Sequence, residues 1–150
     1  MKKNKLMIAV FISMVISLSS CVTQYVPFKA TGGYKSTQLS EDSYQVRISC
    51  NGFTTQDKTS QYVLRRCAEI TLEQGRRYFI IIDNQNLSTI GQVQGKIYSF
   101  PSGQATCKTL NSKDQSPNAL DAVIIIKETE LAAKSRLSTK ARDAFNSFNK

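Results

Sequence analysis

The sequence contains no histidine and no tryptophan, and only three of its 150 residues are proline. Without histidine the chain cannot build a Ser-His-Asp triad, a histidine general base or a histidine metal site. It has no C-x-x-C pair, so zinc ribbons and thioredoxin-like chemistry have no support, and no repeat of solenoid length occurs. These absences remove common catalytic and metal-binding classes. We expect a protein that is not an enzyme and that needs no cofactor.

The chain also lacks an apolar segment of about 20 residues, the length that a helix needs to cross a bilayer. Its main apolar segment, residues 6–18, has thirteen residues and follows a start that is rich in lysine. A basic start followed by a short apolar segment is typical of a signal peptide. We therefore predict that residues 1–20 are a signal peptide.

The residues that follow are more specific. Leu18, Ser19, Ser20 and Cys21 match the bacterial lipobox, in which a branched apolar residue and two small residues precede a cysteine. The apolar segment holds the Cys21 thiol at the membrane face, where it can be alkylated by a diacylglyceryl donor, and the small residues give the signal peptidase access to the backbone. Two or three acyl chains of the palmitate type then hold a protein stably on a membrane. The alternatives are a secreted protein with an incidental cysteine and an uncleaved anchor.

The residue after the cysteine bears on localisation, because an aspartate there favours retention in the inner membrane. The chain has Val22 instead. We expect the lipoprotein to reside in the outer membrane of the cell envelope, with its domain facing the periplasm.

Removal of residues 1–20 changes the charge of the chain. The segment carries three of the twenty basic residues and none of the eleven acidic ones, which leaves seventeen basic residues and a net charge of +6. A basic excess suits anionic lipid, glycan or nucleic acid. Because the chain is exported and tethered, we expect no nucleic acid partner. We expect the membrane itself and a protein of the envelope.

The fold is predicted from one stretch of the chain. Residues 44–50 alternate apolar and polar side chains as a half-buried strand does. Residues 55–74 carry an apolar stripe with helical spacing, with a threonine to cap its start and Gly75 to end it. Residues 78–83 are apolar and β-branched, as in a central strand. The three segments form a βαβ unit.

The rest of the chain adds smaller elements. Residues 21–43 are predicted to be a lipid-anchored tether, and residues 84–95 and 112–117 loops. Two short strands are predicted at 96–100, as an edge strand stopped by Pro101, and at 104–110. Residues 120–134 favour a helix that begins at Ser116 and Pro117, although Val123–Ile126 alone would favour a strand. A last amphipathic helix is predicted at 138–148. The fold class is therefore α+β, with one small domain over residues 44–150.

Three cysteines remain after lipidation, and they lie in an oxidising compartment where a disulfide can form. Cys67 belongs to the apolar stripe of the predicted helix, so we expect it to stay buried and reduced. Cys50 and Cys107 lie in two predicted strands, and we predict them as the pair able to form a disulfide. Three separate buried thiols are the alternative.

The chain contains Gly32-Gly33-Tyr34, Asn51-Gly52-Phe53-Thr54, a segment from Leu64 to Gly75 that ends in A-E-I-T-L-E-Q-G, and Tyr78-Phe79. These motifs resemble those of a family of small bacterial lipoproteins of uncharacterised function, in which that segment reads A-E-L-T-L-E-x-G. The resemblance covers most of residues 32–125. Cys67 stands where the family has alanine, and Arg77 where it often has a bulky residue. The resemblance implies a lipid anchor. It supplies no activity and no catalytic residue.

Charged residues of the predicted helix allow two functional interpretations. Glu69 and Glu73 share one face, as carboxylates for glycoside cleavage would, but pairing with Arg65 and Arg66 on a solvated surface is the better interpretation. A basic patch for an anionic ligand could form from Arg65, Arg66, Arg76 and Arg77. We expect a non-catalytic structural or accessory component of the envelope. The alternative is a binding or stress-sensing module for anionic envelope glycan or lipid.

Overall fold

The computed structural model describes residues 22–30, 32–93, 96–133 and 136–149. The predicted signal peptide, residues 1–20, and the predicted lipidation site Cys21 lie outside these residues. In chain order the elements are β1 (Gly33–Gln38), β2 (Ser43–Ser49), α2 (Gln56–Glu73), β3 (Tyr78–Val93), β4 (Lys96–Leu110), the 3-10 turn η2 (Lys113–Gln115), β5 (Leu120–Asp121), α3 (Ala122–Ala133) and α4 (Thr139–Phe148).

The strands form one sheet in the order β1-β2-β4-β3-β5, and all neighbouring strands are antiparallel. Together with the helices this confirms the predicted α+β class. The predicted strand–helix–strand unit is present as β2, α2 and β3. Since β4 is antiparallel to both β2 and β3, these two strands run parallel to each other with β4 between them. The central strand is therefore β4, where two separate short strands were expected.

Two predictions in this region are wrong. Residues 84–95 were expected to be a loop, but β3 continues to Val93. Residues 96–100 and 104–110 were expected as separate strands interrupted at Pro101, but they belong to the single strand β4. The reason is backbone pairing: β3 and β4 form a long hairpin whose register runs from Tyr78 opposite Leu110 to Val93 opposite Lys96. Such pairing needs no apolar side chains, so polar composition did not reveal it.

Local sequence explains where α2 begins and ends. The Thr55 hydroxyl accepts a hydrogen bond from the Lys58 backbone N–H at 3.3 Å, which confirms the predicted threonine cap. At the other end Gly75 has φ +69°, a left-handed conformation that favours glycine. The Gly75 N–H donates to the Leu72 carbonyl at 2.9 Å, and the Arg76 N–H to the Thr71 carbonyl at 3.0 Å. These two bonds form a Schellman motif, as the position of the glycine predicts.

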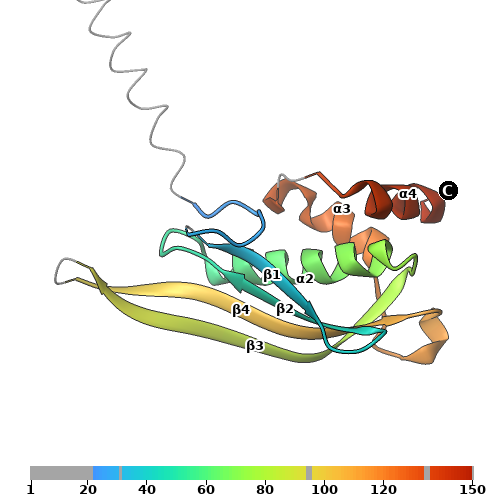
Figure 1. Ribbon diagram of the computed structural model, residues 1–150, viewed down its shortest axis with the longest axis horizontal. Helices are drawn as coiled ribbons and strands as arrows, with labels where there is room; N and C mark the ends of the chain where they lie inside the picture. Colours follow the sequence, from blue (N-terminus) through green and yellow to red (C-terminus); the bar gives the residue numbers. More distant parts are fainter. Residues whose placement is uncertain (1–21, 31, 94–95, 134–135, 150) are drawn as a thin grey trace, which may run out of the picture.

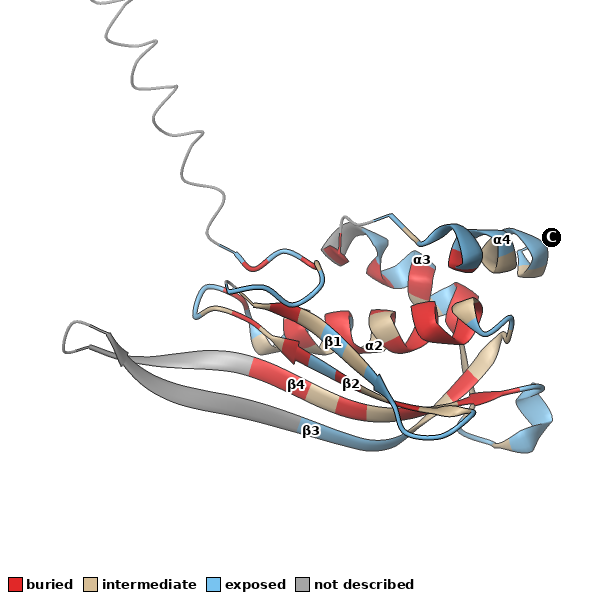
Figure 2. Cartoon of the chain, viewed as in Figure 1, coloured by how far each residue is buried: buried red, intermediate tan, exposed pale blue. Residues whose placement is uncertain are grey.

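The molecule has three layers, with α2 in the middle (Figure 1). One face of the sheet packs against α2, and α3 and α4 pack against the side of α2 that faces away from the sheet. As a result α2 is buried around most of its circumference (Figure 2). The sheet supplies apolar side chains to the core, including Val46, Ile48, Phe79 and Ala105. A helix in this position must bury its polar residues as well as its apolar ones.

The segment predicted as a tether, residues 21–43, is part of the domain from Thr23 onward. It contains β1, and the side chains of Thr23 and Tyr25 are buried. The chain turns tightly through Gly32 and Gly33, which have φ of +103° and +129°. A Cβ on Gly32 would collide with the Ser49 carbonyl, and one on Gly33 with the Val26 carbonyl. Two glycines are needed here because backbone packs directly on backbone.

The C-terminal helices follow the predictions with one shift. Residues 122–133 are helical, as favoured, but α3 begins at Ala122 and not near Ser116. The Asp121 carboxylate accepts from the Val123 backbone N–H at 2.9 Å and so satisfies the start of the helix in place of the predicted serine. Helix α4 begins after Ser138, whose hydroxyl accepts from the Ala141 N–H. The predicted apolar residues of α4 all pack against the core: Ala141, Ala144, Phe145 and Phe148.

Candidate functional site

A group of charged and polar side chains is buried where α2 meets the N-terminal segment and α3. Glu69 lies at its centre. One carboxylate oxygen accepts from Arg65 Nε at 3.0 Å, and the other accepts from Arg66 Nη1 at 3.1 Å and from the Tyr25 hydroxyl at 2.7 Å. Arg66 Nη1 also donates to Glu73 at 3.4 Å. We call these five residues the Glu69 cluster.

Burial makes this cluster unusual for a helix of a small domain. Arg65 is 1% exposed, Tyr25 3% and Glu69 4%. Charged side chains are almost never buried this far unless they are paired, because removal from water costs several kcal/mol per ion. Each hydrogen bond to Glu69 therefore helps to stabilise the buried carboxylate. Arg65 also donates to the Ile126 carbonyl of α3 at 3.3 Å, which fixes that helix against α2.

The protonation state of Tyr25 follows from its surroundings. Burial, together with the Glu69 carboxylate that its hydroxyl faces, raises the pKa of Tyr25 well above its ordinary value. The phenol therefore stays protonated and donates to Glu69 over the whole physiological range. The Tyr25 ring also lies near the Tyr34 ring, with centroids 4.7 Å apart, and the Arg66 guanidinium lies 4.9 Å above Tyr34.

These ion pairs were expected on a solvated helix surface, and that prediction is wrong. The pairs Arg65–Glu69 and Arg66–Glu69 do form. They are buried because α3 and the N-terminal segment cover the side of α2 that was expected to face water. Sequence reasoning missed Tyr25, which lies in the segment taken for a tether. The available signal was an aromatic residue shortly before the Gly-Gly turn.

The two carboxylates expected on one helical face are both bound to arginine. Glu69 and Glu73 both bind Arg66, and Glu73 also accepts from the Ser138 hydroxyl at the start of α4. Their oxygens are directed at fixed donors of the protein. What this arrangement can do chemically is hold the N-terminal segment and both C-terminal helices on α2.

The predicted basic patch of Arg65, Arg66, Arg76 and Arg77 is not formed. Arg65 and Arg66 belong to the Glu69 cluster. Arg76 donates to Thr109 of β4 at 3.0 and 2.9 Å, and Arg77 forms an ion pair with Asp121 at 2.8 Å. Arg65 and Arg66 thus share Glu69, whereas Arg76 binds β4 and Arg77 binds β5, so the four guanidinium groups do not gather in one patch.

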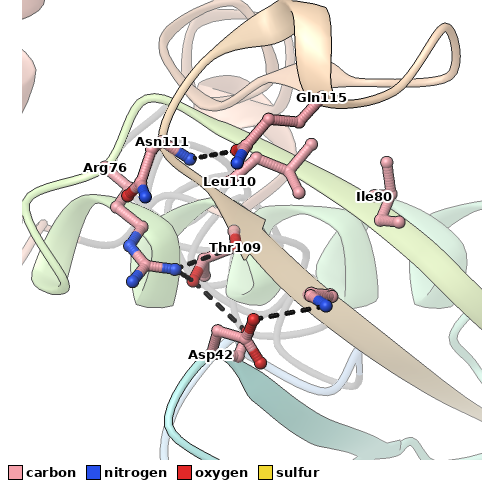
Figure 3. Close-up of a pocket in the computed structure, with 8 residues that line it drawn as sticks. Asp42, Arg76, Ile80, Thr109, Leu110, Asn111 and Gln115 are labelled. Carbon is pink, nitrogen blue, oxygen red and sulfur yellow. Dashed lines mark hydrogen bonds and ion pairs between the residues drawn. The ribbon is translucent and has the colours of Figure 1, made fainter.

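Arg76 lines a shallow pocket of about 320 Å³ at the end of the sheet (Figure 3). The pocket contains Asp42, which pairs with Lys108 at 3.4 Å and accepts from the Thr109 N–H at 2.8 Å through its backbone carbonyl. Hydrogen bonds of Ser43 and Ser40 and the nearby Lys108 lower the pKa of the Asp42 carboxyl. Asp42 pairs with Lys108 and Arg76 binds Thr109, so the polar groups of this pocket join β4 to the chain before β2 and to the end of α2.

A second pocket, of about 380 Å³, lies between α3 and α4. Its wall combines three arginines and three apolar side chains with one carboxylate and one amide: Arg65, Arg136, Arg142, Ile126, Leu137, Phe145, Glu130 and Asn146. Arg142 donates to the Leu137 carbonyl at 3.1 Å at the rim. This mixture of guanidinium groups and apolar surface fits a ligand with an anionic group and a hydrocarbon part.

The cysteines differ from the prediction in one respect. Cys50, Cys67 and Cys107 are all buried and free, so Cys67 is buried as expected. The pairing of Cys50 with Cys107 is wrong for this fold. Cys107 lies opposite Tyr44, at one end of β2, whereas Cys50 follows the other end, about 20 Å along the strand. Cys67 is the neighbour of Cys107, and a hydrogen bond to Cys107 and burial raise the pKa of the Cys67 thiol.

Comparison with protein-family models, curated proteins and solved structures finds no match to the chain. Among the described residues, no helix is both long and apolar enough to cross a membrane. Within the same residues no group of three or more Cys, Asp or Glu side chains is placed to hold a metal ion. The Glu69 cluster joins α2 to the N-terminal segment and to α3 and α4 through the bonds described above.

Proposed function

We propose that the protein is a membrane-anchored lipoprotein of the cell envelope, acylated at Cys21. It acts as a non-catalytic structural or accessory component through contacts with other envelope proteins, and it resides in the outer membrane with its domain facing the periplasm. The observation that carries the proposal is the sequence Leu18-Ser19-Ser20-Cys21 directly after a short apolar segment. The resemblance to small bacterial lipoproteins agrees with it.

Two structural observations support the proposal. The folded domain starts at Thr23, so that an acylated Cys21 would hold the whole domain close to the membrane. The charged residues that could have served chemistry, Glu69 and Glu73, bind arginines of the same helix. Both observations suit a component whose role is to be positioned at a membrane and to contact a partner there.

The experiment compares the full chain with the Cys21→Ser variant in bacterial cells. We expect the full chain to incorporate labelled fatty acid and to yield a mature N-terminus at residue 21 that carries acyl chains in mass spectrometry. We expect Cys21→Ser to remain as a precursor without label, while the control Cys50→Ala is labelled and processed normally. Absence of acyl chains from the wild-type chain would contradict the anchor.

The partner is tested separately, by photo-cross-linking in the cell from positions on two exposed faces. Ile124 of α3 and Ile82 of β3 are 51% and 57% exposed. A discrete cross-linked envelope protein from either position supports the accessory function. Cross-links to lipid alone from both positions would contradict it.

A second function, the binding of an anionic envelope lipid or glycan, is favoured by the pocket between α3 and α4. Its guanidinium groups and apolar wall suit such a ligand. We expect an Arg136→Ala, Arg142→Ala double variant to lose affinity for anionic phospholipid and lipopolysaccharide at least about tenfold. The matched control is Lys127→Ala, Lys140→Ala, which removes two positive charges outside the pocket wall. Equal loss in both double variants would indicate net charge alone.

A further inference from the structure

One end of the domain combines the start of the described chain with the end of β2. The Thr23 hydroxyl accepts from the Asn51 N–H at 2.7 Å, and the Thr23 N–H donates to the Thr54 hydroxyl at 3.1 Å. The Tyr62 hydroxyl donates to the Thr23 carbonyl at 3.2 Å. Because β2 ends at Ser49, these bonds place Thr23 beside that end of the sheet. We call this part of the surface the Thr23 end.

The position of the Thr23 end relative to an anchor at Cys21 is narrowly limited. Only Val22 separates Cys21 from Thr23. Extended backbone spans at most about 7 Å over these two residue steps. Since Thr23 is bonded into the domain, no flexible tether follows the cysteine. If Cys21 is acylated, as in the proposed function, the Thr23 end is the part of the domain nearest to the bilayer.

Exposed apolar side chains gather at this end. Val22 is 36% exposed and Phe53, in the turn that binds Thr23, is 70% exposed. Phe28 is 59% exposed. Its N–H donates to the carbonyl of Tyr34, the residue after Gly33, and Gly33 pairs with Ser49 at the end of β2. Large apolar side chains exposed to this extent near one another mark an interaction surface and are unfavourable in water.

The β3–β4 hairpin extends past the same end (Figure 1). The last pair of β2 with β4 is Ser49 opposite Ser102, but β3 and β4 continue to pair as far as Val93 opposite Lys96. Six pairs beyond Ser102 form a two-stranded ribbon about 20 Å long. A ribbon of only two strands is at best marginally stable in water. We therefore expect contact with another surface to stabilise it.

The composition of the ribbon indicates which surface that is. Residues 88–93 and 96–101 contain no acidic residue and one basic residue, Lys96. Their apolar and aromatic residues are Ile90, Val93, Ile97, Tyr98 and Phe100. A segment that carries branched apolar and aromatic residues, a positive charge and no negative charge suits the interface of an anionic bilayer.

We propose that the Thr23 end, with Val22, Phe28, Phe53 and the ribbon, lies against the bilayer that holds Cys21. The domain is then not suspended from its acyl chains but seated on the membrane in one orientation. The sheet ends and the ribbon face the lipid, and the opposite end, with Leu39 between β1 and β2, points away from it. This inference rests on the proposed acylation for its short link to the membrane.

The absence of tryptophan allows a direct test, because one introduced tryptophan is the sole such fluorophore in the chain. The reporters are Phe53→Trp and Tyr98→Trp at the Thr23 end. The control is Leu39→Trp at the opposite end, where the side chain is 56% exposed. Each acylated full-length variant is reconstituted into vesicles of phosphatidylethanolamine with a minority of phosphatidylglycerol, with or without brominated acyl chains.

We expect bromine to lower the fluorescence of the tryptophans at positions 53 and 98 at least about twofold and to leave that at position 39 unchanged. Equal fluorescence loss at all three positions, or none while the protein floats with the vesicles, would overturn the orientation and leave the anchor standing. A blue shift at 53 and 98 that does not depend on bromine would indicate a protein or a second copy on this surface, and would also overturn it.

Failure of the anchor gives a different result. If mass spectrometry finds no acyl chains on Cys21, the same variants are mixed with the vesicles without acylation. Quenching at 53 and 98 but not at 39 would then support the membrane surface and reject only the proposed anchor. Absence of quenching at all three positions would reject both.

Discussion

The two sides of α2 are both buried, but they are buried in different ways. Toward the sheet, Thr59 and Val63 pack against the backbone of Gly103, and Cys67 meets Cys107. Toward the N-terminal segment and α3, Arg65 and Glu69 are held in an ionic cluster. The first side is neutral and closely packed, whereas the second depends on the pairing of charges.

This difference determines which changes each side tolerates. The stability of a closely packed apolar contact depends on the volumes of its side chains. The free energy of unfolding should therefore respond to small changes in side-chain size on the sheet side. A buried ion pair responds little to size but strongly to the loss of one partner, which leaves a charge uncompensated. One helix thus offers both types of core for comparison in a single unfolding experiment.

The largest effect is expected from Glu69→Ala. The change leaves Arg65 buried without its carboxylate and removes the acceptor of the Tyr25 hydroxyl, so we expect a loss of about 3–5 kcal/mol in the free energy of unfolding. Urea unfolding of residues 22–150 measures it. The matched control is Glu73→Ala, one turn later, whose side chain is 25% exposed and should cost about 1 kcal/mol or less. Similar losses in both variants would show that the ionic side is not specially sensitive.

The contribution of Tyr25 is tested by Tyr25→Phe, for which we expect a loss of about 1.5–3 kcal/mol, since the hydroxyl donates to a charged group. The pH dependence gives a second measurement. The pKa of Tyr25 is raised in the folded state, so its stabilising effect is complete below about pH 10, the ordinary pKa of tyrosine, and is lost as the pH rises above that value. The variant should lack this part of the alkaline loss, while Tyr78→Phe should retain it.

On the sheet side the test is Gly103→Ala. A Cβ at this position would lie 2.9 Å from Val63 Cγ2 and 3.4 Å from Thr59 Cγ2. Both side chains are β-branched and stiff, so the clash forces α2 away from the sheet, and we expect a loss of about 1–3 kcal/mol. Gln104→Ala, the next residue, points to the other face and should change the stability by less than about 0.5 kcal/mol. An unchanged denaturation midpoint for Gly103→Ala would mean that the sheet side is loosely packed.

The smallest effect is expected at the end of α2, which belongs to neither side. Gly75→Val should cost about 1–2 kcal/mol, because a β-branched residue is strained at φ +69° although no atom blocks its Cβ. Gly75→Asn should cost less, since asparagine tolerates this conformation. Equal midpoints for the valine and asparagine variants would contradict a left-handed cap in solution.

Local signals in the sequence predicted the parts of the fold that depend on neighbouring residues. Thr55 and Gly75 bounded α2 correctly, and the apolar spacing around Ala141 and Phe145 located α4. These predictions succeed because caps and helical spacing act within a few residues. The membership of Tyr25 in the core could not be predicted in this way, because its partner Glu69 lies 44 residues later in the chain.

The short range of local sequence signals also explains the wrong predictions for the arginines and the cysteines. Arg65 and Arg66 were expected on the surface because nothing in their own helix shows that α3 covers Arg65 and that β1 lies beside Arg66. The prediction of a Cys50–Cys107 disulfide failed because two strands can be neighbours while the residues in question lie at opposite ends. Register is fixed by pairing across β4, and no short pattern in the sequence reports it.

The place of β4 in the sheet also has a consequence for how the chain acquires its structure. Strand β4, which lies between β2 and β3 in the sheet, comes after both of them in the sequence. It pairs with β2 from Ser43 opposite Lys108 to Ser49 opposite Ser102. Until residue 110 has emerged during synthesis or export, β2 pairs with β1 alone and presents a free edge. The ordering of more than fifty intervening residues must precede the gain from this pairing, which slows folding relative to a helical bundle of similar length. A chain cut short before β4 would therefore expose the edge of the β1–β2 pair and an unpaired β3, and would aggregate, even though α2 and its caps are already encoded in it.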